Sequence, residues 1–208
     1  MKDPMNDTVS EPMNETADET TPPGYRLVLP PGFLLIPVAR STDDEITDLV
    51  RRHYRDLPRD SYGPQIDRTA AQLVTSARSA RDAGVLDLVV PMGVPWRAPV
   101  SLAIAISTGP AGPAPAADDA ELSASEVSET VTTSAGTAVR ATERFAVPDT
   151  AGEMAPLMRM RFGWPIPDSD RQLLAVCTIS GRADPELTPI IDALAELGDL
   201  LLRTLRWD

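Results

Sequence analysis

The last third of the chain constrains the fold more than any other part. Three segments of alternating apolar and polar residues, 137–147, 157–166 and 171–180, follow one another at short intervals. Such alternation is typical of strands with one buried face, and the turn-forming run 167–170 separates the last two. A helix is then predicted to begin near Thr188, a capping residue followed by proline. We expect this helix to bury six aliphatic side chains: Ile190, Ile191, Leu194, Leu197, Leu201 and Leu205.

Two further helices are predicted upstream. The first begins at Thr42, which matches a capping box with Glu45, and Pro58 ends it. Its inward face carries Ile46, Leu49, Val50, His53 and Leu57. Arginines crowd its end, as the helix dipole favours, namely Arg51, Arg52, Arg55 and Arg59. The second helix covers about 64–83 and ends where Gly84 suits a left-handed cap. Its buried stripe is Ile66, Ala70, Leu73, Val74, Ala77 and Ala80.

The remaining segments have weaker patterns. Residues 25–38 are two short apolar strands around Pro-Pro-Gly, the composition of a hairpin or of a bent strand at a sheet edge. Residues 85–92 and 100–107 are predicted strands. The Pro/Ala-rich stretch 109–119 predicts a flexible loop. A weak helix is predicted over 118–130, where Leu122 and Val127 are the large apolar residues.

The order of these elements predicts one α+β domain over residues 25–208, an antiparallel sheet flanked by helices. Residues 1–24 precede it and carry six acidic residues against Lys2 alone, with almost nothing to bury. We therefore predict a disordered acidic tail, because such a segment cannot offset the entropy of ordering. A short repeat beginning at Met5 and Met13 leaves a docking motif as the alternative.

Charge and scarce reactive side chains disfavour several function classes. The net charge of −12 and the pI near 4.5 repel phosphate backbones, so we expect no nucleic-acid partner. The chain holds one histidine and one cysteine, whereas a structural zinc site takes about four such ligands. We expect no metal and no cofactor. Without an apolar run for a membrane span or a signal peptide, we expect no membrane association and a cytoplasmic location.

Several stretches resemble a group of uncharacterised actinobacterial proteins. The resemblance is carried by GTAVRATERF, MRMRFGWPIPDSDRQLLAVCTIS, the closing LLRTLRW and the upstream ARDAGVLDLVVPMGVPWRAPVSLAIAIS. It covers most of residues 25–208. The chain departs from that group at residues 177–180, where Cys-Thr-Ile-Ser replaces a usual Phe-Ser-Thr run, and it lacks the group's aromatic residue before the closing helix.

By its strand order that group is similar to the Mog1/PsbP fold, an α/β/α sandwich with helices on both sides of an antiparallel sheet. Members of that fold are mostly adaptors, among them a binder of a nuclear transport GTPase and an assembly subunit of photosystem II. The resemblance therefore implies partner binding rather than catalysis, by analogy of fold.

His53 and Cys177 each have two interpretations. His53 is either a general base served by Asp48 or Asp56, or a half-buried histidine hydrogen-bonded to backbone. The second is favoured, because no nucleophile motif accompanies the histidine. Cys177 lies in mid-strand among apolar residues and is predicted to be an inert buried side chain, since a reactive thiolate needs exposure and positive neighbours.

Four arginines and two tryptophans are the candidate binding residues. Arg140 and Arg144 share one face of their strand, and Arg159 and Arg161 share one face of the next. If the two strands pair in that register, the four form a basic strip suited to an anion or an acidic partner. The alternative is ion pairing with Glu143, Asp168 or helix acids.

The tryptophans Trp96 and Trp164 lie in proline-flanked turns. Each is either an exposed anchor of an interface or a lid on the core. Acid pairs such as Asp43/Asp44 and Asp118/Asp119 belong to caps and loops, and two-acid hydrolysis needs carboxylates that face each other across a cleft.

These observations predict a non-enzymatic adaptor or accessory subunit of a bacterial cytoplasmic complex, whose partner is another protein. The first alternative is a hydrolase that uses carboxylates or His53. The second is a self-associating structural component, a homo-oligomer. A polar cleft that holds His53 and two acids would favour the hydrolase, whereas an apolar environment around His53 would argue against it.

Overall fold

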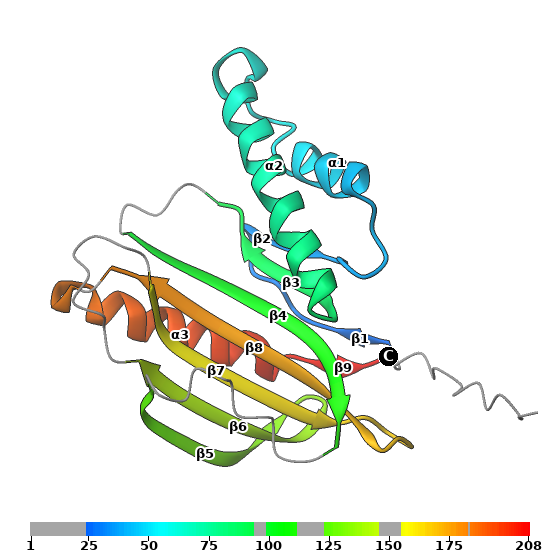
Figure 1. Cartoon of the computed structure of the whole chain (residues 1–208), viewed down its shortest axis with the longest axis vertical. Helices are drawn as coiled ribbons and strands as arrows, with labels where there is room; N and C mark the ends of the chain where they lie inside the picture. Colours follow the sequence, from blue (N-terminus) through cyan, green and yellow to red (C-terminus); the bar gives the residue numbers. More distant parts are fainter. Residues whose placement is uncertain (1–23, 94–98, 112–122, 146–154, 183) are drawn as a thin grey trace, which may run out of the picture.

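The computed structural model describes residues 24–93, 99–111, 123–145, 155–182 and 184–208 (Figure 1). Over these ranges the fold is α+β, with a seven-stranded antiparallel sheet and three α-helices. The strand order in the sheet is β2-β3-β4-β8-β7-β6-β5. The bounds are β2 Phe33–Ile36, β3 Val85–Pro91, β4 Val100–Pro110, β5 Ser123–Thr133, β6 Gly136–Phe145, β7 Ala155–Pro165 and β8 Arg171–Gly181. The predicted α+β class with an antiparallel sheet is confirmed.

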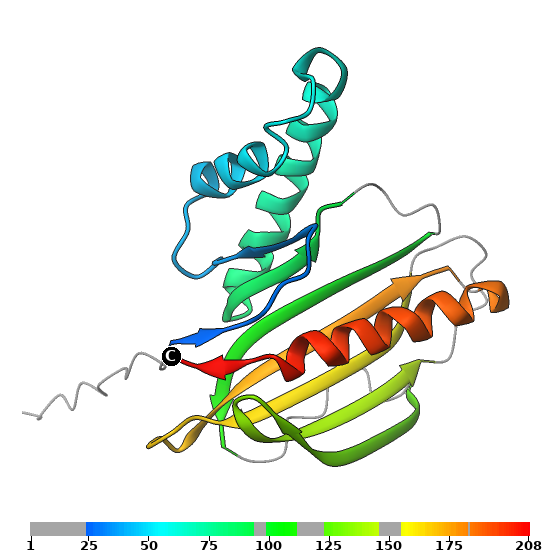
Figure 2. The same ribbon diagram turned by 180° about the vertical axis from the view of Figure 1, so that it is seen from behind.

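Helix α3 (Thr188–Arg203) packs along one face of this sheet (Figure 2). It follows a short 3-10 helix, η2 (Pro185–Leu187). Gly198 lets α3 approach closely, since a Cβ there would lie 2.8 Å from Sγ of Cys177 and 3.1 Å from Cε of Met160. Each aliphatic side chain fully buried in such a core contributes about 1.5–3 kcal/mol. The buried residues of this face include Leu102, Ile104, Ile106, Met160, Phe162, Trp164, Cys177, Ile179, Ile191, Leu194, Leu201 and Leu205.

Helices α1 (Asp43–His53) and α2 (Arg59–Asp82) cover the opposite face at β2 and β3. We call α1, the linking residues 54–58 and α2 the helical hairpin. Ile46 of α1 and Ala77 of α2 pack against Ile36 of β2. The hairpin extends past the end of the sheet, so that the turn between its helices lies away from the other strands (Figure 1).

Local signals at both ends of the hairpin are confirmed. The backbone N–H of Thr42 donates to the Glu45 carboxylate at 2.7 Å, and the N–H of Glu45 donates to the Thr42 hydroxyl at 3.3 Å, which completes the capping box. Gly84 has φ +76°, a left-handed conformation that favours glycine.

The boundary between the two helices differs from the prediction. Helix α1 ends at His53 rather than at Pro58, because residues 54–57 form turns with Val50, Arg52 and Tyr54 as acceptors. Leu57 is therefore 38% exposed instead of buried. Pro58 directly precedes α2, and Pro64 lies inside this helix at the cost of one backbone hydrogen bond.

The prediction of a weak helix over 118–130 is wrong. Residues 123–133 form β5, whose partner is β6. The Val- and Thr-rich end of this segment favours a strand, and Val131 is buried while Val127, on the same face, is 62% exposed at the sheet edge. The predicted loop over 109–119 also begins later, since Gly109 and Pro110 belong to β4. Residues 112–119 lie outside the described part of the chain.

The first and last described strands of the chain pair in a two-stranded sheet. Strand β1 (Tyr25–Arg26) pairs with β9 (Arg206–Trp207), so the predicted hairpin over 25–38 is wrong, although β2 does lie at a sheet edge. Gly24, placed by prediction in the tail, accepts a hydrogen bond from the N–H of Asp208 at 2.9 Å. The rest of the predicted tail, 1–23, is outside the described residues.

The closing helix differs from its prediction at two of the six positions expected to be buried, since Ile190 is exposed and Leu197 is half-buried, and Leu205 lies beyond the helix end at Arg203. Ile190 is 36% exposed, whereas Ile191, Leu194, Leu201 and Leu205 are buried as predicted. One residue corresponds to about 100° around a helix, so Ile190 lies off the face that contacts the sheet. No helix in the described ranges has the length and apolar character required to span a membrane.

Candidate binding site on the helical hairpin

Two adjoining pockets lie at the turn of the helical hairpin. We call the first the arginine pocket; it has a volume of about 650 Å³ and is lined by Arg51, Tyr54, Arg55, Arg59, Gly63, Pro64, Ile66 and Asp67. We call the second the apolar pocket; it has a volume of about 590 Å³ and is lined by His53, Tyr54, Asp56, Leu57, Tyr62, Gln65, Ile66, Thr69, Met92 and Gly93. Tyr54 and Ile66 line both, so the two pockets adjoin at these side chains.

The carbonyl oxygen of Met92 fixes the wall of the apolar pocket. The Tyr54 hydroxyl donates to it at 2.7 Å, and Nε2 of His53 lies 3.2 Å away. A carbonyl only accepts, so Nε2 carries the proton in this contact. The two rings meet edge to face, with centroids 4.9 Å apart. Burial raises the pKa of Tyr54, which keeps its phenol protonated as the donor.

These contacts match the second of the two interpretations of His53. The histidine is half-buried and bonds backbone, as the favoured interpretation predicted. Its pocket is lined mainly by apolar surface. Asp56 is the one carboxylate among its described lining residues, and this side chain is 90% exposed. The described ranges contain no group of three or more His, Cys, Asp or Glu placed to hold a metal ion.

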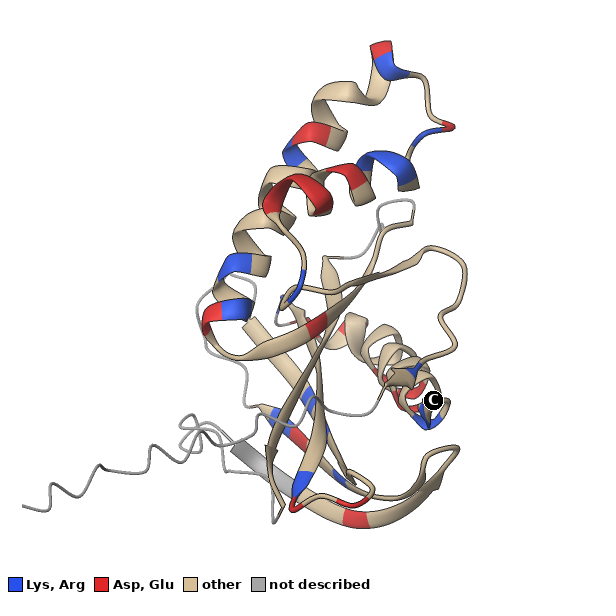
Figure 3. Cartoon of the chain, turned by 90° about the vertical axis from the view of Figure 1, so that its right-hand side faces the viewer, with Lys and Arg blue, Asp and Glu red and all other residues tan. Residues whose placement is uncertain are grey.

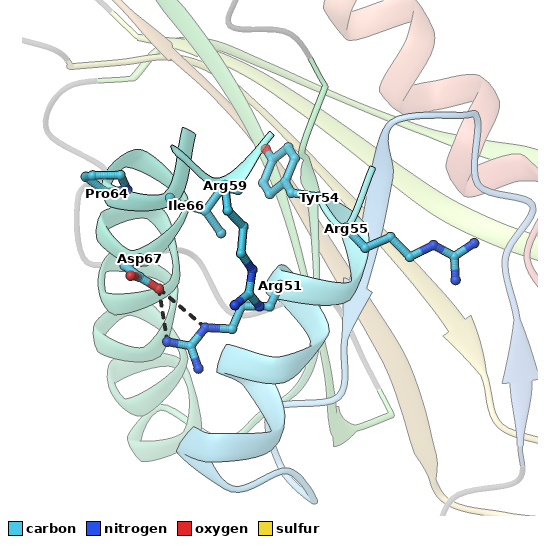
Figure 4. Close-up of a pocket in the computed structure, with 8 residues that line it drawn as sticks. Arg51, Tyr54, Arg55, Arg59, Pro64, Ile66 and Asp67 are labelled. Atoms are coloured by element: carbon cyan, nitrogen blue, oxygen red, sulfur yellow. Dashed lines mark hydrogen bonds and ion pairs between the residues drawn. The ribbon is translucent and has the colours of Figure 1, made fainter. Parts of the chain in front are cut away.

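The arginine pocket contains more positive than negative charge. Arg51 donates to the Asp67 carboxylate from Nη2 at 3.0 Å and from Nε at 3.3 Å (Figure 4). Arg59 reaches into the space beside this pair, whereas Arg55 points away from it (Figure 4). The Nε of Arg55 lies 3.7 Å from Asp56, and Arg59 has no ion-pair partner within the described ranges. Figure 3 shows the acids of α1 at its start and its basic residues at its end.

The predicted four-arginine strip does not exist. In the register of β6 and β7, Ala141 is opposite Arg161 and Glu143 is opposite Arg159. Residues opposite each other share a face, so Arg159 and Arg161 lie on the face away from α3, whereas Arg140 and Arg144 lie on the α3 face. Sequence alternation gave the correct faces within each strand but not the register between strands.

Ion pairing, the alternative interpretation, is confirmed for Arg140 and Arg144. Arg140 contacts both Glu129 of β5 and Asp199 of α3, and Arg144 lies 2.7 Å from Asp192 of α3. These pairs hold the end strands of the sheet to the helix.

The other two arginines lie against the opposite face. Arg159 lies 3.7 Å from Glu143, and its guanidinium is 4.9 Å from the Phe145 ring centroid, within cation–π range. Arg161 is buried, with 9% of its surface exposed. Both make further interactions. Arg140, Arg144 and Arg159 therefore each have an acidic partner, and Arg161 is buried.

Trp164 is not an exposed anchor. It is 0% exposed, stacks on Phe162 with ring centroids 5.3 Å apart, and donates from Nε1 to the Thr133 hydroxyl at 2.9 Å. Its interpretation as a lid on the core is confirmed, and its assignment as a partner-binding residue is wrong. Trp96 lies outside the described residues. Cys177 is fully buried, and burial raises the pKa of its thiol to about 12, which confirms the inert interpretation.

Sequence reasoning missed the pocket residues Tyr54, Tyr62 and Met92. The available signal was the pair of tyrosines on either side of Pro58, within a run of four arginines and one acid over residues 51–59. Comparison of the chain with protein families, with curated proteins and with solved structures found no match.

Proposed function

We propose that this protein is a protein-binding adaptor or accessory subunit that works in the bacterial cytoplasm and binds its partner through the apolar pocket of the helical hairpin. The observation that carries the proposal is the exposed apolar surface at the mouth of that pocket, where Leu57 is 38% and Tyr62 is 42% exposed. Pockets lined by aromatic and aliphatic side chains, with a few polar groups, are the usual binding sites for an apolar anchor.

The position of the pocket supports this proposal. It lies between the hairpin turn and the residues that follow β3. The hairpin turn extends past the sheet (Figure 1). The Mog1/PsbP-like arrangement belongs to the same proposal: helices on both faces of an antiparallel sheet are the architecture on which adaptors of that fold are built. A hydrolase centred on His53 has less support, because an apolar lining and one exposed carboxylate do not supply two acids across a polar cleft.

A displayed library of random 16-residue peptides tests the proposal, with the purified full-length chain as bait. The test variant is Leu57→Ser with Tyr62→Ser. Leu200→Ser is the matched control, because Leu200 is an exposed leucine (55%) on α3 and lines neither pocket. Wild type and control are expected to enrich the same peptides, rich in large apolar residues, and the double variant is expected to bind them about tenfold or more weakly.

Three outcomes would overturn the proposal. They are no enrichment by the wild-type chain, equal binding by the double variant, and sedimentation of the wild type as a dimer that the double variant abolishes. The last result would assign the pocket to a second copy of the chain and make the protein a self-associating component. Circular dichroism of both variants separates loss of binding from loss of fold, because all three substituted residues are exposed.

A further inference from the structure

The charge of the arginine pocket indicates which chemical class of partner segment the hairpin binds. This inference rests on the proposed function. The arginine pocket adjoins the apolar pocket at Tyr54 and Ile66, which line both. A segment that places an apolar side chain in one pocket therefore has its neighbouring residues close to the arginines that line the other.

The local charge of the hairpin turn is opposite to that of the whole chain. Residues 51–59 contain four arginines and one acid, in a protein with a net charge of −12. Arg51 already binds Asp67, and Arg55 has only the adjacent, 90% exposed Asp56. Arg59 lines the pocket with no ion-pair partner within the described ranges. The turn thus has donors without acceptors, and guanidinium forks match carboxylates in geometry and charge.

The exposure of these arginines indicates a macromolecular ligand rather than a small free anion. The side chains of Arg51 and Arg55 are 48% and 78% exposed. An exposed guanidinium gains little from an isolated ion in water. A carboxylate held over it by an adjacent apolar anchor has a high effective concentration and removes water from the pair. Nucleic acid is disfavoured, because an extended phosphate backbone would meet the acidic remainder of the surface.

We infer that the hairpin recognises an acidic segment of its partner protein, in which carboxylates flank one large apolar side chain. The apolar side chain enters the apolar pocket, one carboxylate binds Arg59 beside the Arg51–Asp67 pair, and another binds Arg55, which points away from that pair. The specificity of the adaptor then comes from the arginine pocket, while the apolar pocket supplies much of the binding energy.

Charge reversal tests this inference with the same displayed peptides. The test variant is Arg55→Glu with Arg59→Glu. The control is Arg68→Glu with Arg182→Glu, which changes the net charge equally at exposed arginines outside both pockets. Wild type and control are expected to enrich peptides with Asp or Glu beside an aromatic or aliphatic residue. The test variant is expected to bind the lead peptide about tenfold or more weakly.

A charge swap in the lead peptide completes the test. Replacing its acids with lysine is expected to abolish binding to wild type and to restore binding to the Arg55→Glu/Arg59→Glu variant. Raising NaCl from 50 to 500 mM is expected to weaken the binding of the lead peptide to wild type, because salt screens exposed pairs of guanidinium and carboxylate groups.

Three results would overturn the inference while leaving the adaptor proposal intact. The first is enrichment of apolar peptides that carry no acids. The second is a charge swap without rescue. The third is a synthetic peptide of residues 1–23 that binds the pocket as tightly as the lead peptide, because the occupant would then be the acidic N-terminal segment of the chain itself. No enrichment at all would instead overturn the proposed function.

Discussion

Arginines on the sheet and arginines on the helical hairpin have different surroundings. Arg140 contacts two acids, Glu129 and Asp199, and Asp199 also accepts from Nε of Arg203 at 2.7 Å. On the hairpin, Arg59 has no ion-pair partner in the described part of the chain. The sheet with α3 therefore uses its charges to fix a helix in place, whereas the hairpin turn presents its charges to solvent. We expect mutations to affect stability in the first region and binding in the second.

The largest expected difference concerns two aromatic side chains. Trp164→Ala removes a fully buried indole that stacks on Phe162 and should destabilise the fold by about 3–5 kcal/mol. Tyr62→Ala removes a 42% exposed ring on the hairpin and should change the free energy of unfolding by less than about 0.5 kcal/mol. Urea unfolding followed by circular dichroism measures both. Equal losses would show that the hairpin is part of the same packed core.

A smaller difference is expected between two carboxylates. Asp199→Asn leaves Arg140 and Arg203 without the acid they share, at a site where Asp199 is 16% exposed, and should cost about 2–3 kcal/mol. Asp67→Asn breaks the exposed pair with Arg51 and should cost at most about 1 kcal/mol. The same unfolding experiment tests this comparison. A larger cost for Asp67→Asn would mean that the hairpin turn also depends on its charges for stability.

Two helix glycines should respond to alanine with losses of stability of different size. At Gly198 a methyl group would meet Cys177 and Met160, so Gly198→Ala should destabilise the protein by about 1–2 kcal/mol despite the better helix propensity of alanine. Gly63, in α2, has no atom beyond its chain neighbours within 4 Å of such a methyl group, but Pro64 follows it and disfavours a helical residue that carries a Cβ, so Gly63→Ala should change the free energy of unfolding by less than about 0.5 kcal/mol. Thermal and urea unfolding give both values.

A double substitution tests whether the contact with Cys177 causes the predicted loss of stability in Gly198→Ala. In a Cys177→Ala background the nearest atom is removed, so the cost of Gly198→Ala should fall. An unchanged cost would place the strain elsewhere, for example at the Met160 methyl group 3.1 Å from the new carbon.

Local patterns predicted the elements whose two faces differ most. The alternating segments that became β6, β7 and β8, and the capping box at Thr42, could be read from neighbouring residues. The strand β5 could not, because at the sheet edge Val127 stays exposed and the apolar alternation is lost. The arginine strip failed for another reason: a register shift of one residue between strands moves every side chain to the opposite face.

The candidate site depends on a contact that no local pattern contains. His53 and Tyr54 meet the carbonyl of Met92, which follows β3 and is 39 residues from His53 in the sequence. The arginines of residues 51–59 were visible, but their spacing equally suits the end of a helix. Only the folded arrangement places an apolar pocket next to them.

The smallest expected effect is the response of the hairpin to acid. Hydrogen bonds from Arg78 lower the pKa of Asp43, and the backbone N–H of Thr42 lowers the pKa of Glu45. A lowered carboxyl pKa contributes stability that is present above the ordinary values of 3.8 and 4.5 and is lost as pH falls through the lower folded values. Asp43→Asn with Glu45→Gln should therefore flatten the decline in stability below about pH 4.5, measured by urea unfolding between pH 6 and pH 2.5. Asp44→Asn with Asp48→Asn, on the same helix, is the control, and an equal flattening by the control would assign the response to total charge rather than to the cap and the Arg78 pair.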